Sequence, residues 1–218
     1  MAFVSGRKYD LFLSYAHAEM AWAEAFGEAL RDEFQIRTGE QVTFWQDSHN
    51  LRLGQKWASE IEEGIRNAAA FLTIVSPSYF KSPWCREESR IALEKTLEAL
   101  KVESFYRFLK VVKTPGPGQA HEEFLKVLQD IRFFNEADGY ELPVGSAEYT
   151  SMIRACFRHI RELLTLMSNK GRKLYVAPGV IEMHKQREEL ECELKDKGFT
   201  VKPEILDRSN SRRRRKTA

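Results

Sequence analysis

The sequence predicts an α/β domain in which a parallel five-stranded sheet is covered by helices on both faces, followed by a short β-α-β extension. Short apolar runs alternate with segments whose apolar residues recur at helical spacing. Strands that alternate with helices form parallel sheets through right-handed crossovers. The length of 218 residues and the hydrophobic content of 43% provide one full core, with room for a smaller unit beside it.

Short apolar runs predict the five strands of the sheet. The first run, YDLFLSYA, combines aromatic and aliphatic residues and is short enough for a buried strand. A polar segment at 47–55 follows the second run and is expected to form a loop. The predicted strands are residues 9–16, 42–46, 70–76, 105–112 and 131–135.

Helical spacing predicts the segments between these strands. Trp22, Phe26 and Leu30 share one face of the first helix. Ser82 and Pro83 suit the N-cap and the first position of the third helix. The predicted helices are residues 18–34, one beginning near 57, 83–101, a short helix or turn at 122–129, and 147–167.

A second unit is predicted after residue 168. A strand at 173–177, a charged helix at 182–197 ended by Gly198, and a strand at 200–203 form a β-α-β arrangement. One such unit cannot bury its own faces, so we expect it to dock, to contact another chain, or to open a further domain. The predicted domains are 8–168 and 169–207, with a disordered basic tail at 208–218.

The net charge of +2 conceals an asymmetry. The tail carries six Lys or Arg residues and no acid, so removing those six charges leaves residues 1–207 at −4. A basic run attracts nucleic acid, but no aromatic residue interleaves with Arg212 to Lys216. We therefore expect a solvated tail and no nucleic-acid partner.

Several classes of protein are excluded by missing patterns. No apolar run approaches the roughly 18 to 20 residues of a spanning helix, and the N-terminus lacks a signal-peptide core. Cys85, Cys156 and Cys192 are far apart, which excludes a disulfide framework and a zinc site. The five histidines lack metal-ligand spacing, and no phosphate-binding glycine loop is present. We expect a cytoplasmic protein without a membrane or metal partner.

The ends of three strands gather the residues that could bind a ligand. Ser14, Tyr15 and Ala16 end the first strand, residues 47–57 follow the second, and residues 76–88 follow the third. The carboxyl ends of parallel strands meet at one edge of the sheet, where ligands of such folds bind. The predicted site therefore lies at this edge.

Three motifs carry a resemblance to a known family. The segments YDLFLSYAH, FWQDSHNLRLGQKWASEIEEGI and FLTIVSPSYFKSPWCREE occur in the order and spacing of a bacterial-type TIR (Toll/interleukin-1 receptor) domain. The resemblance covers about residues 8–167 and implies a flavodoxin-like, three-layer fold. It also implies one of two activities: cleavage of NAD+ by a glutamate on the third helix, or TIR–TIR association alone.

The WxxxE pattern of the family falls on Trp84 and Glu88, so the resemblance implies that Glu88 is catalytic. A spacing of four places both residues on one helix face, near the positive helix start. Taken alone, the charge run at 86–88 would be expected to face water. Nicotinamide leaves NAD+ as a neutral molecule, so one carboxylate suffices without a second group to protonate the leaving atom.

The remaining candidates would bind NAD+ as a substrate, with no separate cofactor. Each aromatic candidate has packing as its alternative, which we favour for Trp84 and leave open for Tyr15 and Trp45. The candidates are Ser14, Tyr15 and Ala16 at the end of the first strand, Trp45, Tyr79 and Trp84 as aromatic surfaces, and Asp47, Arg52 and Lys56 for loop closure.

The resemblance suggests a NAD+ glycohydrolase that self-association activates, with a bacterial antiphage or immune role and a trigger from an upstream sensor domain or protein. The products would be nicotinamide and either ADP-ribose or a cyclic ADP-ribose. The alternative is a non-enzymatic TIR–TIR scaffold. We do not expect a phospho-acceptor or flavin-binding domain. For the phospho-acceptor, Ser14 and Ser76 stand where that fold needs acidic residues.

Overall fold

The computed structural model describes residues 2–46, 57–96, 101–102, 105–115, 130–170, 172–176 and 184–202. The chain forms two compact units, Met1–Ser168 and Asn169–Ala218. Within the described ranges, no helix is both long and apolar enough to cross a membrane.

The first unit is built on a five-stranded sheet in which every strand pair is parallel, which confirms the predicted fold class. The order β2-β1-β3-β6-β7 is that of a flavodoxin-like sheet. Leu11 of β1 lies between Phe44 of β2 and Ala70 of β3, which fixes the central register. The strands are β1 (Tyr9–Tyr15), β2 (Phe44–Gln46), β3 (Ala68–Val75), β6 (Phe108–Val112) and β7 (Asp130–Arg132).

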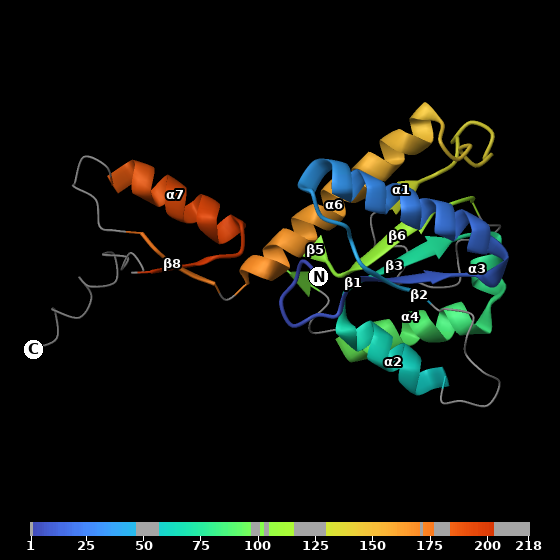
Figure 1. Ribbon diagram of the computed structural model, residues 1–218, viewed down its shortest axis with the longest axis horizontal. Helices are drawn as coiled ribbons and strands as arrows, with labels where there is room; N and C mark the ends of the chain where they lie inside the picture. Colours follow the sequence, from blue (N-terminus) through green and yellow to red (C-terminus); the bar gives the residue numbers. More distant parts are fainter. Residues whose placement is uncertain are drawn as a thin grey trace, which may run out of the picture. The chain divides into compact units, whose positions relative to one another are not determined.

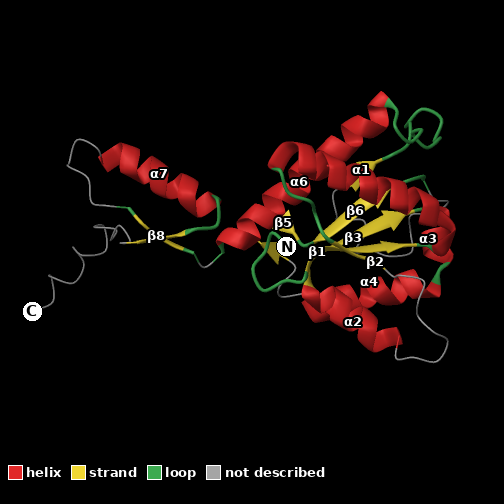
Figure 2. Ribbon diagram, in the orientation of Figure 1, coloured by secondary structure: helices red, strands yellow, loops and turns green. Residues whose placement is uncertain are grey.

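Helices cover both faces of this sheet (Figures 1 and 2). α1 (Met20–Thr38) and α6 (Ala147–Asn169) pack on one face, and α2 (Trp57–Asn67) and α4 (Pro83–Thr96) pack on the other. Leu11 and Leu13 of β1 join the core under α1 and α6, whereas Phe12 joins the core under α2 and α4. Because side chains alternate along a strand, Ser14 faces α4.

Two short helices follow the ends of the central strands. η1 (His17–Glu19) follows β1, and α3 (Pro77–Lys81) follows β3. The Ser76 hydroxyl accepts a hydrogen bond from the Tyr79 amide at 3.2 Å and so caps α3. Sequence periodicity did not predict α3, because one helical turn is too short to show a repeat.

Two predicted boundaries were wrong near residue 100. α4 gives way to β4 (Lys101–Val102), which pairs antiparallel with β5 (Phe105–Tyr106), so the helix does not reach residue 101. The predicted strand at 105–112 is interrupted at Arg107, whose buried guanidinium donates to the carbonyls of Ala68 and Ala69. Only β6 joins the main sheet. The helix or turn expected at 122–129 lies outside the described residues.

The second unit contains the predicted β-α-β arrangement. It consists of β8 (Lys173–Tyr175), α7 (His184–Asp196) and β9 (Thr200–Lys202), and β8 pairs parallel with β9. Gly198 follows α7 with a φ of +83°, a conformation that glycine adopts without strain. Val201 is buried, whereas Tyr175 is exposed.

The cap at the start of α4 makes a testable contribution to stability. The Cys85 amide donates to the Ser82 hydroxyl at 3.3 Å, with Pro83 as the first helical residue. We expect Ser82→Ala to lower the free energy of unfolding by about 1 kcal/mol in urea titrations. Ser151→Ala, at an exposed position within α6, is the matched control and should not lower stability, because alanine has the higher helix propensity. Equal effects of the two changes would contradict the capping role.

Candidate active site

The carboxyl edge of the sheet brings the first and third strands side by side. β1 ends at Tyr15 and β3 at Val75, and these strands are hydrogen-bonded neighbours. Chain connections leave β1 and β3 in opposite directions across this sheet, which makes the point between them the usual ligand site of the fold. Residues after either strand therefore meet at the predicted edge.

Glu88 lies in the second turn of α4, and its side chain is turned toward the end of β1. The Ser14 hydroxyl donates to Glu88 Oε2 at 2.5 Å. Glu88 is 6% exposed and Ser14 is 1% exposed. The charge run alone predicted that Glu88 faces water. That prediction is wrong, because the carboxylate is buried at the carboxyl edge of the sheet.

Tyr79 of α3 connects this pair to α4 through hydrogen bonds of its hydroxyl group. Its hydroxyl lies 2.6 Å from Ser89 Oγ and 3.3 Å from Ser14 Oγ, and it donates to the Cys85 carbonyl at 3.2 Å. Tyr79 and Ser89 are both fully buried. Burial raises the pKa of Tyr79 well above its ordinary value, so the phenol keeps its proton.

The candidate site residues predicted from the sequence do not all lie together in the structure. Ser14, Tyr79 and Glu88 come together, and Ala16 packs beside Tyr79 and Cys85 in a small buried cluster. Since Tyr79 is fully buried, its ring offers no surface to a ligand in this structure. Tyr15 lies on the other face of β1, against the core under α1 and α6.

Trp45 serves packing between β1 and α2. Its ring stacks on Phe12 with centroids 4.4 Å apart and an interplanar angle of 13°. A Cβ added at Gly64 would lie 2.7 Å from Trp45, so the close approach of α2 requires glycine at that position. Asp47, Arg52 and Lys56 lie outside the described residues.

Trp84 differs from the expectation that it packs in the core. It lies one helical turn before Glu88 in the first turn of α4, and it is 60% exposed. The packing interpretation is therefore wrong. Trp84 therefore presents an exposed aromatic surface one helical turn before the buried Glu88.

Ser89 is the site residue that sequence reasoning missed. It follows Glu88 in a charged segment that is expected to face water, so the sequence does not mark it as a buried residue. It lies four positions after Cys85, an apolar residue that is 2% exposed, and this spacing could have indicated the inward face of α4.

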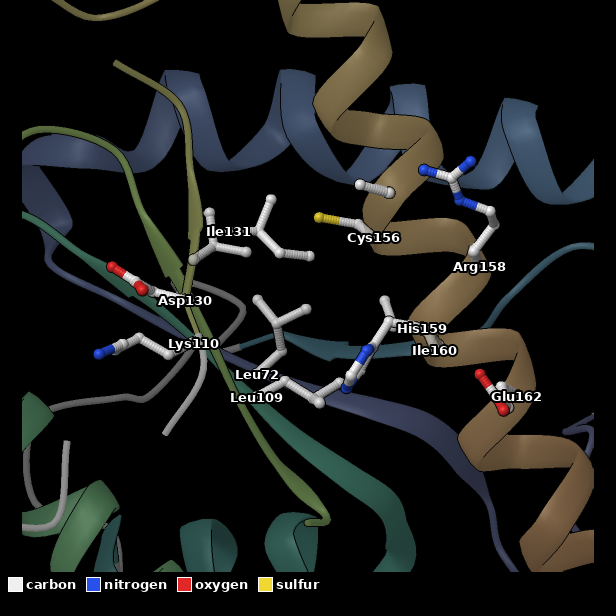
Figure 3. A pocket seen from close by; sticks show the side chains of 12 residues that line it. Leu72, Leu109, Lys110, Asp130, Ile131, Cys156, Arg158, His159, Ile160 and Glu162 are labelled. Atoms are coloured by element: carbon white, nitrogen blue, oxygen red, sulfur yellow. The ribbon is translucent and has the colours of Figure 1, made fainter. Parts of the chain in front are cut away.

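A groove of about 400 Å³ lies away from this site, between α6 and strands β3, β6 and β7 (Figure 3). Leu72, Leu109 and Ile131 give it an apolar floor, while Lys110 and Glu162 bring charge to its lining. It occupies the α6 side of the sheet, whereas Glu88 lies on the α4 side. Among the described residues, no group of three His, Cys, Asp or Glu side chains could hold a metal ion.

Comparison with protein families identifies the first unit. The model of the TIR domain family matches residues 11–144, which is more than half of the chain. The chain belongs to the TIR domain family. This confirms the resemblance drawn from the three sequence motifs, and it agrees with the flavodoxin-like sheet order. Glu88 and Ser14 lie within the matched segment of the TIR domain.

Individual relatives of this TIR domain are distant. A 2′ cyclic ADP-D-ribose synthase of Bacteroides thetaiotaomicron is 26% identical over 96 residues, which is 44% of this chain and 31% of the relative's length. The TIR domain of a Toll-related receptor of Hydra magnipapillata has a TM-score of 0.48 and 19% identity, covering 71% of this chain and 99% of that one. The TIR domains of the activated Roq1 resistosome have a TM-score of 0.38 and 17% identity, covering 87% and 99%.

Proposed function

We propose that this TIR domain cleaves NAD+ at the bond between nicotinamide and ribose, with Glu88 as the catalytic residue. The observation that carries the proposal is the buried Glu88 carboxylate at the β1/β3 edge, one turn beyond the exposed Trp84. The activity named for the Bacteroides relative supports the same reaction class. A buried carboxylate at a ligand-binding edge is typical of a functional group.

The carboxylate suits the charge that develops in this reaction. As nicotinamide departs with the bonding electron pair, positive charge spreads over C1′ and the ring oxygen of the ribose, and a fixed anion stabilises that transition state. Each carboxylate oxygen accepts more than one hydrogen bond, so Glu88 can bind ribose hydroxyls while it is bonded to Ser14. Attack of water at C1′ then gives ADP-ribose and a proton, whereas attack of an adenine nitrogen gives a cyclic product.

We further propose that the exposed Trp84 stacks on a base of NAD+, and that Asp47, Arg52 and Lys56 contribute to binding of the substrate, as the family resemblance implies. Uncontrolled loss of NAD+ would kill a cell, so the activity requires a trigger. Self-association of TIR domains under a sensor, in a bacterial antiphage response, supplies one.

The test is nicotinamide release from NAD+ by the full chain, dilute and then concentrated or crowded, with nucleotides separated by chromatography. We expect little release from dilute protein and clear release from assembled protein. The same separation distinguishes ADP-ribose from a cyclic product. If no assembled state releases nicotinamide, the enzymatic function is excluded and the non-enzymatic TIR–TIR scaffold is left as the function.

The groove between α6 and β7 favours a docking role as the second candidate. Its apolar floor and charged lining suit a protein segment, and we propose that a second copy of this chain occupies it. Under this candidate, the TIR domain acts only through assembly.

We expect Glu162→Lys, which reverses a charge in the groove, to reduce self-association about tenfold or more in sedimentation experiments. Glu148→Lys, at another exposed position of α6, is the matched control and should assemble as the parent does. Assembly that is unchanged by Glu162→Lys would exclude this groove as the interface.

A further inference from the structure

We propose that Ser14 and Tyr79 are positioning residues, which hold the Glu88 carboxylate in one orientation through a directional chain of hydrogen bonds. This inference rests on the proposed role of Glu88 in NAD+ cleavage. Ser14 and Tyr79 hold the ionised carboxylate at the carboxyl edge of the sheet, and neither residue contacts the substrate.

The direction of the chain follows from the number of protons. Ser14 has a single hydroxyl proton and donates it to Glu88 Oε2 at 2.5 Å. Toward Tyr79, at 3.3 Å, Ser14 can therefore only accept. In the proposed chain, the phenol proton of Tyr79 is shared between Ser14 Oγ and the Cys85 carbonyl, and Ser89, whose Oγ lies 2.6 Å from the phenol oxygen, is the donor of that pair.

This direction favours the ionised form of Glu88. A buried carboxylate without donors is costly, and a donated hydroxyl bond stabilises its charge. Tyr79 can donate because a phenol keeps its proton at neutral pH, and burial raises its pKa further. The chain Ser89 to Tyr79 to Ser14 to Glu88 therefore ends on the one group that carries a negative charge.

Geometry separates positioning from substrate binding. Ser14 is 1% exposed and Tyr79 is fully buried, so both act on a ligand through Glu88. A serine hydroxyl can rotate among three staggered positions, and the bond from Tyr79 selects the one that aims at Oε2. Loss of either hydroxyl frees the carboxylate to leave its productive orientation, which lowers kcat more than it raises KM.

Steady-state kinetics of nicotinamide release by the assembled full chain test the proposal. We expect Ser14→Ala to lower kcat about tenfold with KM unchanged, and Tyr79→Phe to lower it less, since it acts through Ser14. Ser14→Thr keeps a hydroxyl and should restore most of kcat. A parental kcat in Ser14→Ala, or Ser14→Thr as impaired as Ser14→Ala, would overturn the inference.

A stability cycle tests the Ser14 to Glu88 bond without any activity. We expect Ser14→Ala to lower Tm by about 2–4 °C in the parent and by less than half of that in a Glu88→Ala background. Equal losses in both backgrounds would overturn the inference. If coupling is present but the parent releases no nicotinamide in any assembled state, the proposed function fails and the positioning claim falls with it.

Discussion

Replacing Glu88 by glutamine is expected to lower nicotinamide release by about 10²–10³-fold, with the fold and the self-association unchanged. Glutamine has nearly the same shape and can still accept from Ser14, but it lacks the negative charge that would stabilise positive charge on the ribose. The measurement is the rate of nicotinamide release under assembling conditions, with sedimentation and thermal melting of the same preparations.

The neighbouring residue provides the matched control. Glu87 pairs with Arg90 on the outer side of α4, at 2.5 Å, with 38% of its side chain exposed. The Arg90 hydrogen bond lowers the pKa of Glu87, so it is a charged but solvent-facing carboxylate. Glu87→Gln should keep the parental rate. Release by Glu88→Gln at the parental rate would show that another group does the chemistry.

Replacing Trp84 by alanine is expected to raise KM for NAD+ about tenfold or more, because stacking on a base contributes about 1–3 kcal/mol. Little loss of stability should accompany the change, since Trp84 is 60% exposed. Tyr140→Ala is the control: Tyr140 is 76% exposed and lies outside α4. If both changes leave KM unaltered, the indole does not contact the substrate.

The parallel sheet and the position of Glu88 near the start of α4 could be predicted from the chain alone. Alternating apolar runs indicate a parallel sheet, and Ser82 with Pro83 marks the helix start. The inward direction of Glu88 could not be predicted in the same way. Residues 86–88 are all charged, so their residue types do not distinguish Glu88, which lies on the buried face of α4 opposite the Ser14 hydroxyl.

Two predictions were wrong because residue type and apolar pattern do not show the tertiary contacts of a residue. Trp84 was expected in the core because large aromatic residues usually pack there. Its burial in the first turn of α4 would require other residues to cover that turn, and Trp84 is 60% exposed. The strand at 105–112 looked continuous because its apolar pattern is continuous. Its interruption follows from Arg107, whose guanidinium reaches carbonyls 38 and 39 positions away in the sequence.

The most direct test of the central claim, that Glu88 contacts the ribose of NAD+, is a structure of the assembled Glu88→Gln chain with NAD+ bound. The account predicts the ribose hydroxyls within hydrogen-bond distance of residue 88, and a base of the dinucleotide against Trp84. A dinucleotide bound in the groove beside α6, with residue 88 still buried against Ser14 and out of its reach, would contradict the account.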